Sequence, residues 1–328
     1  MTKTMNVKHL TGKLMAGLAT ALLAASALAQ NYPSKPVRIV VPYSPGGIDV
    51  VARLVGQKLQ ERLGQPFIIE NKPGARSQIG ADFVGSQTPD GHMLLYIAGT
   101  SHLKLTGRGK TAAWEANPQL AAVAQVGLSP LILASTNAKP FKSVAELIAY
   151  AKANPGKLNF ASTGYATAGH MSWELFALEA GIAAELVEYK GSSDMNKALI
   201  AGDVDVSIDA ATVVPFIRAG SVRGLAVMSA KRTPLMPELA SIAETVPNFD
   251  TSIWYGMFAT GGAPAPVLAK LSSEIAAVVR LPDVAERFQT LVLEIPPLLT
   301  PPQFEVLIRE QAARWTKALR ETRINYQP

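Results

Sequence analysis

The sequence of 328 residues contains no cysteine. This absence excludes disulfide bonds, zinc sites built on thiolates and cysteine nucleophiles. The folded chain must therefore be held together by its hydrophobic core, and a hydrophobic content of 48% is enough to form one. We expect a chain of this length to divide into two domains.

Histidine is also scarce, and the usual signatures of enzymes are missing. The histidines show no metal-ligand spacing and stand at positions His9, His92, His102 and His170. No Gly-x-Ser-x-Gly motif is present, and the stretch GRGKT at 107–111 lacks the first glycine of a P-loop, because Lys104 takes that position. We therefore predict no enzymatic activity, no metal and no cofactor, with a secreted hydrolase as the enzymatic alternative.

Charge of one sign does not dominate, and no long basic run occurs. Residues 1–13 carry three lysines and no acid, residues 14–28 are apolar, and Ala27-Leu28-Ala29 fits a cleavage site, so we predict a signal peptide over 1–29. Without these three of the 31 basic residues, the chain keeps all 25 acids and a net charge of +3. The sequence therefore predicts an exported, periplasmic protein without stable membrane insertion or a nucleic-acid partner.

Strand-like and helix-like segments alternate along most of the remaining chain. Strand-like runs such as 37–41, 67–70, 93–97 and 204–208 alternate with amphipathic stretches such as 49–63. Ser143 is a predicted N-cap for a helix over 144–154, with Glu146 at the capping-box position. The polar stretch 104–117 is predicted to be a loop with one short helix. This alternation predicts an α/β fold of mixed, mostly parallel sheets flanked by helices.

The stretch VPYSPGGIDVVAR, at 41–53, joins a buried strand to a helix through a Pro-Gly-Gly turn. Glycines let the backbone approach a ligand closely, and a helix N-terminus offers unpaired N–H groups, so this geometry suits an anion. The alternative is a connection that needs glycines only for its own turn. A second Gly, Ser and Thr-rich loop, 162–169, also follows a predicted strand. Ligands in α/β proteins bind at such strand ends.

Several blocks of the sequence, in order, resemble one family. These blocks are YPSKPVRIVVPYSPGGIDVVAR (32–53), LGQPFIIENKPGARSQIGADFV (63–84), TPDGHMLL (88–95), LNFASTG (158–164), EYKGSSD (188–194), GDVDVSID (202–209), LAVMSAKRTPLMPELASIAE (225–244), WYGMFA (254–259) and PAPVLAKLSSEI (264–275). They are similar to the Bug, or TctC-type, periplasmic solute-binding proteins of tripartite tricarboxylate transport systems. The similarity covers nearly the whole chain after the predicted signal peptide.

The resemblance implies a two-lobe type II periplasmic binding protein. One lobe would comprise 36–135 and 251–328, and the other 136–250, closing on a small carboxylate ligand. Family members bind such ligands through backbone N–H groups, hydroxyls and ordered waters. The implied ligand-binding residues of the first lobe are Tyr43, Ser44, Gly46, Gly47, Asp49, Arg76, Ser77, Gln78, Thr100 and Ser101. Those of the second lobe are Ser162, Thr163, Gly164, Thr167, His170 and Asp209.

Some implied roles stay open on the sequence alone. The Pro-Gly-Gly turn is one residue shorter than is usual in the family, because only Ile48 separates it from Asp49. Asp49 is either a helix cap or the partner of a ligand ammonium group. Arg76 is either a bidentate partner for a second carboxylate or an exposed arginine at the cleft rim.

The resemblance also implies partners, namely the membrane subunits of a transporter, with the receptor itself a monomer. A sensor protein that docks on a membrane receptor when its ligand is bound is the second interpretation. Both interpretations use the same ligand-bound form of the protein, so sequence does not separate them.

Overall fold

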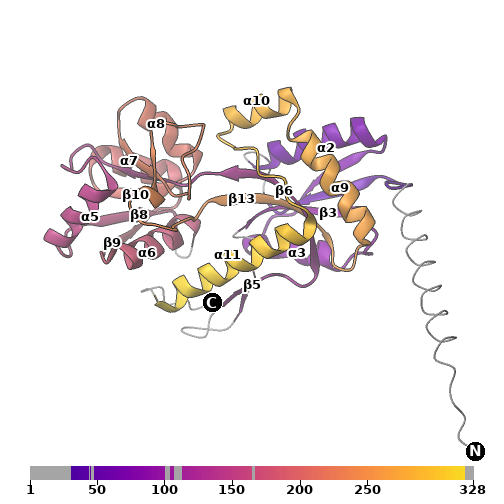
Figure 1. Ribbon diagram of the computed structural model, residues 1–328, viewed down its shortest axis with the longest axis horizontal. Helices are drawn as coiled ribbons and strands as arrows, with labels where there is room; N and C mark the ends of the chain where they lie inside the picture. The colour runs from indigo at the N-terminus through magenta and orange to yellow at the C-terminus, as the bar shows by residue number, and fades with distance from the viewer. Residues whose placement is uncertain are drawn as a thin grey trace, which may run out of the picture. The chain divides into compact units, whose positions relative to one another are not determined.

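The computed structural model describes residues 31–43, 45, 48–99, 104–106, 113–164 and 167–321 (Figure 1). The predicted signal peptide and five of the predicted site residues, Ser44, Gly46, Gly47, Thr100 and Ser101, lie outside these ranges. Within them, no helix is both long and apolar enough to cross a bilayer. The α/β fold class predicted from the alternating pattern is confirmed.

The first sheet has five strands in the order β2-β1-β3-β13-β6. Its strands are β1 (Val37–Val41), β2 (Phe67–Asn71), β3 (Met93–Ala98), β6 (Leu120–Ser129) and β13 (Ile253–Thr260). β1 runs parallel to both β2 and β3, and Val41 stands opposite Asn71 at the end of the β1–β2 ladder. Four of the five side chains of β1 are fully buried, which explains its continuous β-branched run.

Three helices accompany the strands of the first sheet, namely α2 (Ile48–Leu63), α3 (Gln78–Gly85) and α9 (Ala265–Val278). Helix α2 buries Val51, Val55 and Leu59, which recur at four-residue spacing and form its apolar stripe. Helices α2 and α9 pack against each other (Figure 1). Within 41–53, β1 ends at Val41 and α2 begins at Ile48, in agreement with the predicted strand and helix, and Ser44, Gly46 and Gly47 of the predicted turn lie outside the described residues.

The second sheet has six strands in the order β12-β11-β7-β10-β8-β9. Its strands are β7 (Ile132–Ser135), β8 (Asn159–Ser162), β9 (Glu185–Glu188), β10 (Val206–Asp209), β11 (Arg223–Val227) and β12 (Ala240–Ser241). β7 is antiparallel to β10 and β11, whereas β8 is parallel to β9 and β10. The sheet is therefore mixed, in agreement with the predicted class.

The helices that belong with the second sheet are α5 (Val144–Ala153), α6 (Ala168–Ala180), α7 (Ser192–Ala201) and α8 (Val214–Arg218). Phe160 of β8 stacks on Trp173 of α6, with ring centroids 4.7 Å apart, and both side chains are buried. Ser143 caps α5 by accepting from the backbone N–H of Glu146 at 3.2 Å, as predicted. The reciprocal bond differs from the predicted capping box, because Glu146 accepts from Lys142 N at 2.6 Å.

Part of the prediction for 104–117 is wrong. β4 (Lys104–Thr106) and β5 (Ala113–Glu115) form a two-stranded antiparallel ladder, with Leu105 opposite Trp114. Each strand has only three residues, too few for the period-two alternation that identifies a strand in sequence. β5 contacts the long helix α11 (Pro301–Glu321), which follows α10 (Pro282–Thr290).

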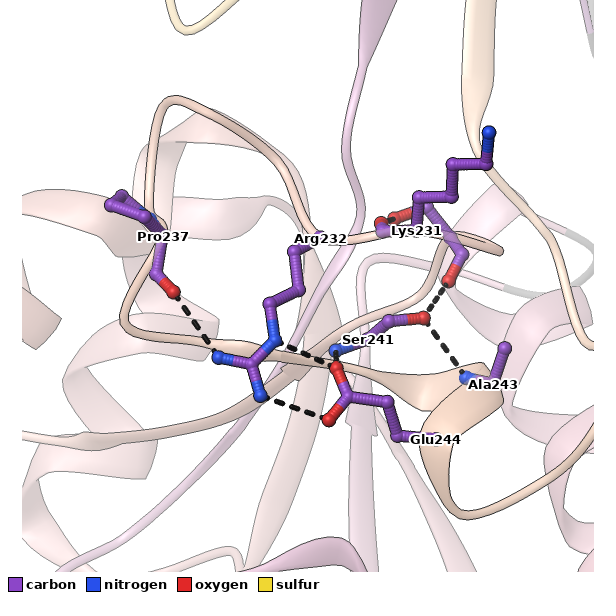
Figure 2. A network of polar contacts seen from close by, with 7 residues as sticks. Lys231, Arg232, Pro237, Ser241, Ala243 and Glu244 are labelled. Carbon is purple, nitrogen blue, oxygen red and sulfur yellow. Dashed lines mark hydrogen bonds and ion pairs between the residues drawn. The ribbon is translucent and has the colours of Figure 1, made fainter.

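A polar network fixes the segment that follows β11 (Figure 2). Arg232 forms a two-pronged ion pair with Glu244, at 2.7 and 2.9 Å, and this pairing together with the N–H of Ser241 lowers the pKa of Glu244 to about 2. The Ser241 hydroxyl accepts from Ala243 N at 3.1 Å and donates to Ser229 O at 2.6 Å, and Glu244 closes the capping box by accepting from Ser241 N at 2.9 Å. These bonds connect Ser229, Arg232 and the 3-10 turn that contains Glu244.

The contacts of the chain divide it into two units. One comprises residues up to Tyr96 with Pro118–Ala124 and Met257–Val278, and the other comprises Ile97–Asn117, Gln125–Gly256 and Val279–Pro328. The lobe boundaries implied by the family resemblance, 36–135 with 251–328 and 136–250, stay predictions.

Candidate functional site

The side chain of Asn71 closes the turn that follows β1. Its Nδ2 donates to the backbone oxygen of Tyr43 at 2.9 Å and to Oδ1 of Asp49, also at 2.9 Å. Tyr43 precedes the Pro-Gly-Gly turn and Asp49 follows it, so a single amide group links the two ends of the turn. Asn71 reaches both because it stands opposite Val41, the last residue of β1, in the parallel ladder.

The carboxylate of Asp49 is buried, with 3% of the residue exposed, and its charge is paired. Arg53, one helical turn further along α2, donates from Nε to Oδ2 at 2.7 Å and from Nη2 to Oδ1 at 3.2 Å. The same Nη2 donates to Oδ1 of Asn71 at 3.0 Å. A two-pronged arginine and an amide therefore already occupy the oxygens of Asp49, which favours the structural role over recognition of a ligand ammonium group.

The predicted binding loop 74–79 follows β2 and is built from unusual backbone conformations. Gly74, Ala75 and Ser77 have φ values of 126°, 45° and 77°, so two residues with side chains occupy a region that normally favours glycine. Ser77 is buried, and its hydroxyl points to the backbone oxygen of Pro42 at 3.5 Å. Such strained residues cluster at ligand-binding sites, where the surrounding structure holds them in place.

Gln78 and Arg76 are the other predicted binding residues of this loop. Gln78 begins α3 and donates from Nε2 to Oδ1 of Asp82 at 2.6 Å, one helical turn along. Arg76 lies in a short 3-10 helix, η1 (Ala75–Ser77). The two hypotheses for its guanidinium both remain predictions.

The loop that follows β8 is stabilised by its own hydroxyl groups. Ser162 Oγ lies 2.9 Å from Gly164 O and 3.3 Å from both Gly164 N and Thr167 Oγ1. Thr167 is the N-cap of α6, and its hydroxyl accepts from His170 N at 3.4 Å while donating to Gly164 O at 2.9 Å. Four predicted site residues are thus brought together, and Ser162 serves mainly to shape the loop, because its side chain is buried. Thr163 between them is partly exposed.

His170 is a neutral residue near the start of α6. Only 2% of it is exposed, and burial lowers the pKa of its imidazole to about 4. Its Nε2 lies 3.9 Å from Oε1 of Glu174. At neutral pH this histidine carries no charge with which to attract an anion, so its contribution to the loop is packing and a backbone N–H.

Asp209 ends β10 and links two helical segments. Its Oδ1 accepts from Ser192 Oγ, at the start of α7, at 3.2 Å, and its Oδ2 accepts from the hydroxyl of Thr212. Asn196 extends the network by donating to Thr212 Oγ1 at 3.3 Å. Ser192 and Thr212 therefore hold the carboxylate in place at the strand end.

Asn71 and Arg53, which bond to Asp49 beside the Pro-Gly-Gly turn, were not predicted as site residues from the sequence. Their signals were present but weak: Arg53 stands four residues after Asp49 on a predicted helix, and Asn71 directly follows a predicted strand.

Within the described ranges, no group of three or more His, Asp or Glu side chains is arranged to hold a metal ion. The loops offer neutral donors and backbone N–H groups, which suit a reversible anion site.

A family model described as "Tripartite tricarboxylate transporter family receptor" (TctC) matches residues 51–324. Among the relatives, BugT of Bordetella pertussis is 32% identical over 322 residues, covering 97% of this chain and 98% of that protein. A UPF0065 protein from the tcbD-tcbE intergenic region of Pseudomonas sp. strain P51 is 33% identical over 320 residues, covering 95% of each chain.

Several solved structures are also similar to this chain. The R. palustris protein Rpa4515, solved with adipate, is 31% identical with a TM-score of 0.70, over 88% of this chain and 98% of that one. MatC of Rhodopseudomonas palustris, solved with bound malate, is 28% identical with a TM-score of 0.67, over 88% and 100% of the two chains. A TctC solute-binding protein from Polaromonas has a TM-score of 0.76 at 22% identity, over 88% and 99%, and supports the fold.

Proposed function

The chain belongs to the TctC family of tripartite tricarboxylate transporter receptors and is therefore a solute-binding receptor, and we propose that its solute is a small carboxylate. This proposal rests on two similar proteins that were solved with adipate and with malate. Their similarity to this chain extends over 98% and 100% of their own lengths. Both of these ligands are dicarboxylates. We infer that a dicarboxylate is the first class of ligand to test.

The local chemistry of the loops supports an anionic ligand. Asp49 is neutralised by Arg53, and Asp209 is hydrogen-bonded by Ser192 and Thr212. The donors that support an anion are the backbone N–H groups at the start of α6 and the partly exposed Thr163 in the loop before it. A helix N-terminus and oriented N–H groups bind a carboxylate without burying an unpaired cation, which would be costly.

We further propose that the protein is exported to the periplasm through residues 1–29 and delivers its ligand to the membrane subunits of a tripartite carrier. The family description and the signal-peptide pattern in the sequence support these two statements. No covalent step is part of the proposal, because the receptor contributes only reversible binding.

A thermal-shift panel tests the choice of ligand class. The protein without residues 1–29 is heated with adipate, malate, glutamate, citrate and benzoate, and with the neutral dimethyl ester of adipate as the matched control. A ligand at about 100 times its Kd stabilises the folded state by about 2.7 kcal/mol, which raises the melting temperature by several degrees. We expect at least one carboxylate to do so and the ester to have no effect. Equal shifts with adipate and its dimethyl ester would contradict the proposal.

A further inference from the structure

A cavity of about 290 Å³ lies within the second of the two contact units, the one that contains Gln125–Gly256 and Val279–Pro328. It is bounded by β6, by the segment 250–254 and by one stripe of helix α11, at positions 307, 310, 311 and 314. This spacing of three and four residues places the four side chains on one face of α11. None of the predicted carboxylate-binding residues lines the cavity.

Three buried polar atoms at this cavity have no hydrogen-bond partner among the described residues. They are Oε1 of Gln125 on β6, Oε1 of Gln311 and the indole Nε1 of Trp315, both on α11. Gln125 is 6% exposed and Trp315 is 2% exposed. A buried polar atom left without a partner costs about 1–3 kcal/mol. Three of them around one cavity therefore indicate that something polar satisfies them there.

The chemistry of these three atoms restricts the ligand. The indole Nε1 is only a donor and requires an acceptor, whereas the two carbonyl oxygens require N–H or O–H donors. A primary carboxamide offers one carbonyl oxygen and two N–H hydrogens, which matches this set. A carboxylate offers no donor to the glutamine oxygens, and a simple ammonium offers no acceptor to the indole.

The rest of the lining agrees with a neutral ligand that has an apolar body. The carboxylates of Asp250 and Glu310 and the guanidinium of Arg314 also border the cavity, so the acidic groups outnumber the basic one and the net charge disfavours an anion. The indole of Trp254 lines it as well and packs edge-on against Phe304, with centroids 5.0 Å apart. At about 30 Å³ for each water-sized group, the cavity accommodates about ten non-hydrogen atoms. An aromatic or short aliphatic amide is of this size.

We propose that this cavity is a second binding site, specific for a small neutral carboxamide. The amide carbonyl oxygen accepts from Trp315 Nε1, and the amide nitrogen donates to Gln125 and Gln311. The site does not depend on the carboxylate receptor function, because it uses different residues and recognises a neutral ligand instead of an anion.

The test uses benzamide and benzoate, which differ only in the group that the site recognises. The chain has four tryptophans, so the ¹⁵N-labelled protein without residues 1–29 gives four indole N–H signals in an NMR spectrum. The Trp315→Phe variant identifies the signal of Trp315 by its disappearance. We expect benzamide to move that signal downfield with saturation, because its N–H gains an acceptor, and benzoate at equal concentration to leave it in place.

The Gln125→Leu variant tests the amide nitrogen. This change of similar volume removes one acceptor and should weaken benzamide binding about five- to tenfold, in line with the loss of one hydrogen bond. The melting temperature should stay the same or rise, because an unpaired buried oxygen is removed. The matched control, Gln289→Leu, alters an exposed glutamine of α10 and should leave benzamide binding unchanged.

Three results would overturn the proposal. The first is a Trp315 signal that benzamide does not move, which would mean that the cavity holds only water. The second is an equal response to benzoate, which would mean that the amide group is not recognised. The third is unchanged benzamide affinity in Gln125→Leu. None of these results depends on whether a carboxylate binds elsewhere in the protein.

Discussion

Asn71 donates its side-chain N–H to Oδ1 of Asp49 at 2.9 Å, across 22 positions of sequence. The bond connects the end of β2 to the first turn of α2, and the same amide nitrogen also holds the backbone oxygen of Tyr43. The Pro-Gly-Gly turn is therefore fastened at both ends by a residue outside it. This clamp, defined by Tyr43, Asp49, Arg53 and Asn71, links the residues on either side of the turn that the family resemblance implies in ligand binding.

Replacing Asn71 by alanine should release Tyr43 and Asp49 from each other. The change removes two hydrogen bonds and takes one donor from the buried carboxylate of Asp49, so we expect the free energy of unfolding to fall by about 1–3 kcal/mol. Ligand affinity should fall as well, because the two residues on either side of the predicted binding turn are no longer linked. Urea denaturation and calorimetric titration measure the two effects.

The matched control for this change is Gln57→Ala. Gln57 is an exposed residue of α2 whose side-chain amide donates only to Glu61, at 3.1 Å. We expect a stability change within about 0.5 kcal/mol and unaltered affinity. If Asn71→Ala behaved like Gln57→Ala in both measurements, the clamp would have no role.

The Asp49→Asn variant separates a structural aspartate from an ammonium-binding one. Since Arg53 and Asn71 already occupy its carboxylate, we expect the variant to weaken binding of an acidic amino acid and of a plain dicarboxylate by similar factors. Titration of glutamate and of adipate gives the two ratios. Selective loss of glutamate binding would show instead that Asp49 contacts the ligand ammonium group.

His170 should make the protein less stable in mild acid. Its pKa is about 4 in the folded state and about 6.5 when unfolded, so the unfolded chain binds the proton more readily. The corresponding stability is complete above pH 6.5 and is lost as the pH falls through about 4, to a total of roughly 3 kcal/mol. In His170→Gln, the fall of unfolding free energy over this pH range should be smaller by that amount. An identical pH profile in the variant would refute this assignment.

Gly169, at the start of α6, allows close packing on β10. A Cβ at this position would lie 2.5 Å from the backbone oxygen of Ile208, and backbone does not move aside easily. We expect Gly169→Ala to destabilise the protein by about 1–3 kcal/mol. Gly191→Ala is the control, since its φ of 172° is ordinary extended backbone and no atom lies within 4 Å of the added Cβ. Similar melting temperatures for both variants would contradict the packing argument.

Periodicity in the sequence was enough to predict most helices and strands. The run 37–41 is apolar because β1 is central and buried, and the predicted helices over 49–63 and 144–154 agree with α2 and α5 to within one residue. The ladder of β4 and β5 was missed because three-residue strands carry no period. The clamp was missed for a different reason. Asn71 meets Asp49 only because β1 and β2 pair in parallel with Val41 opposite Asn71, and this register is not visible in either strand alone.

The proposed carboxamide cavity could not be predicted from sequence either. Gln125, Trp254 and Gln311 come from three distant segments, and each alone resembles an ordinary core or helix residue. Only the packing of α11 over the segment 250–254 brings them together. Four of the predicted site residues, Ser162, Gly164, Thr167 and His170, could be grouped from the sequence because they follow one another in a single loop.

Calorimetric titration of the protein without residues 1–29 tests the central claim most directly. The ligands are adipate and malate, with the dimethyl ester of adipate as the neutral control, and circular dichroism confirms that the sample is folded. We predict micromolar binding of at least one carboxylate with one site per chain and no heat from the ester. A folded protein that gives no binding heat with adipate, malate or the other carboxylates of the panel would contradict the proposed function.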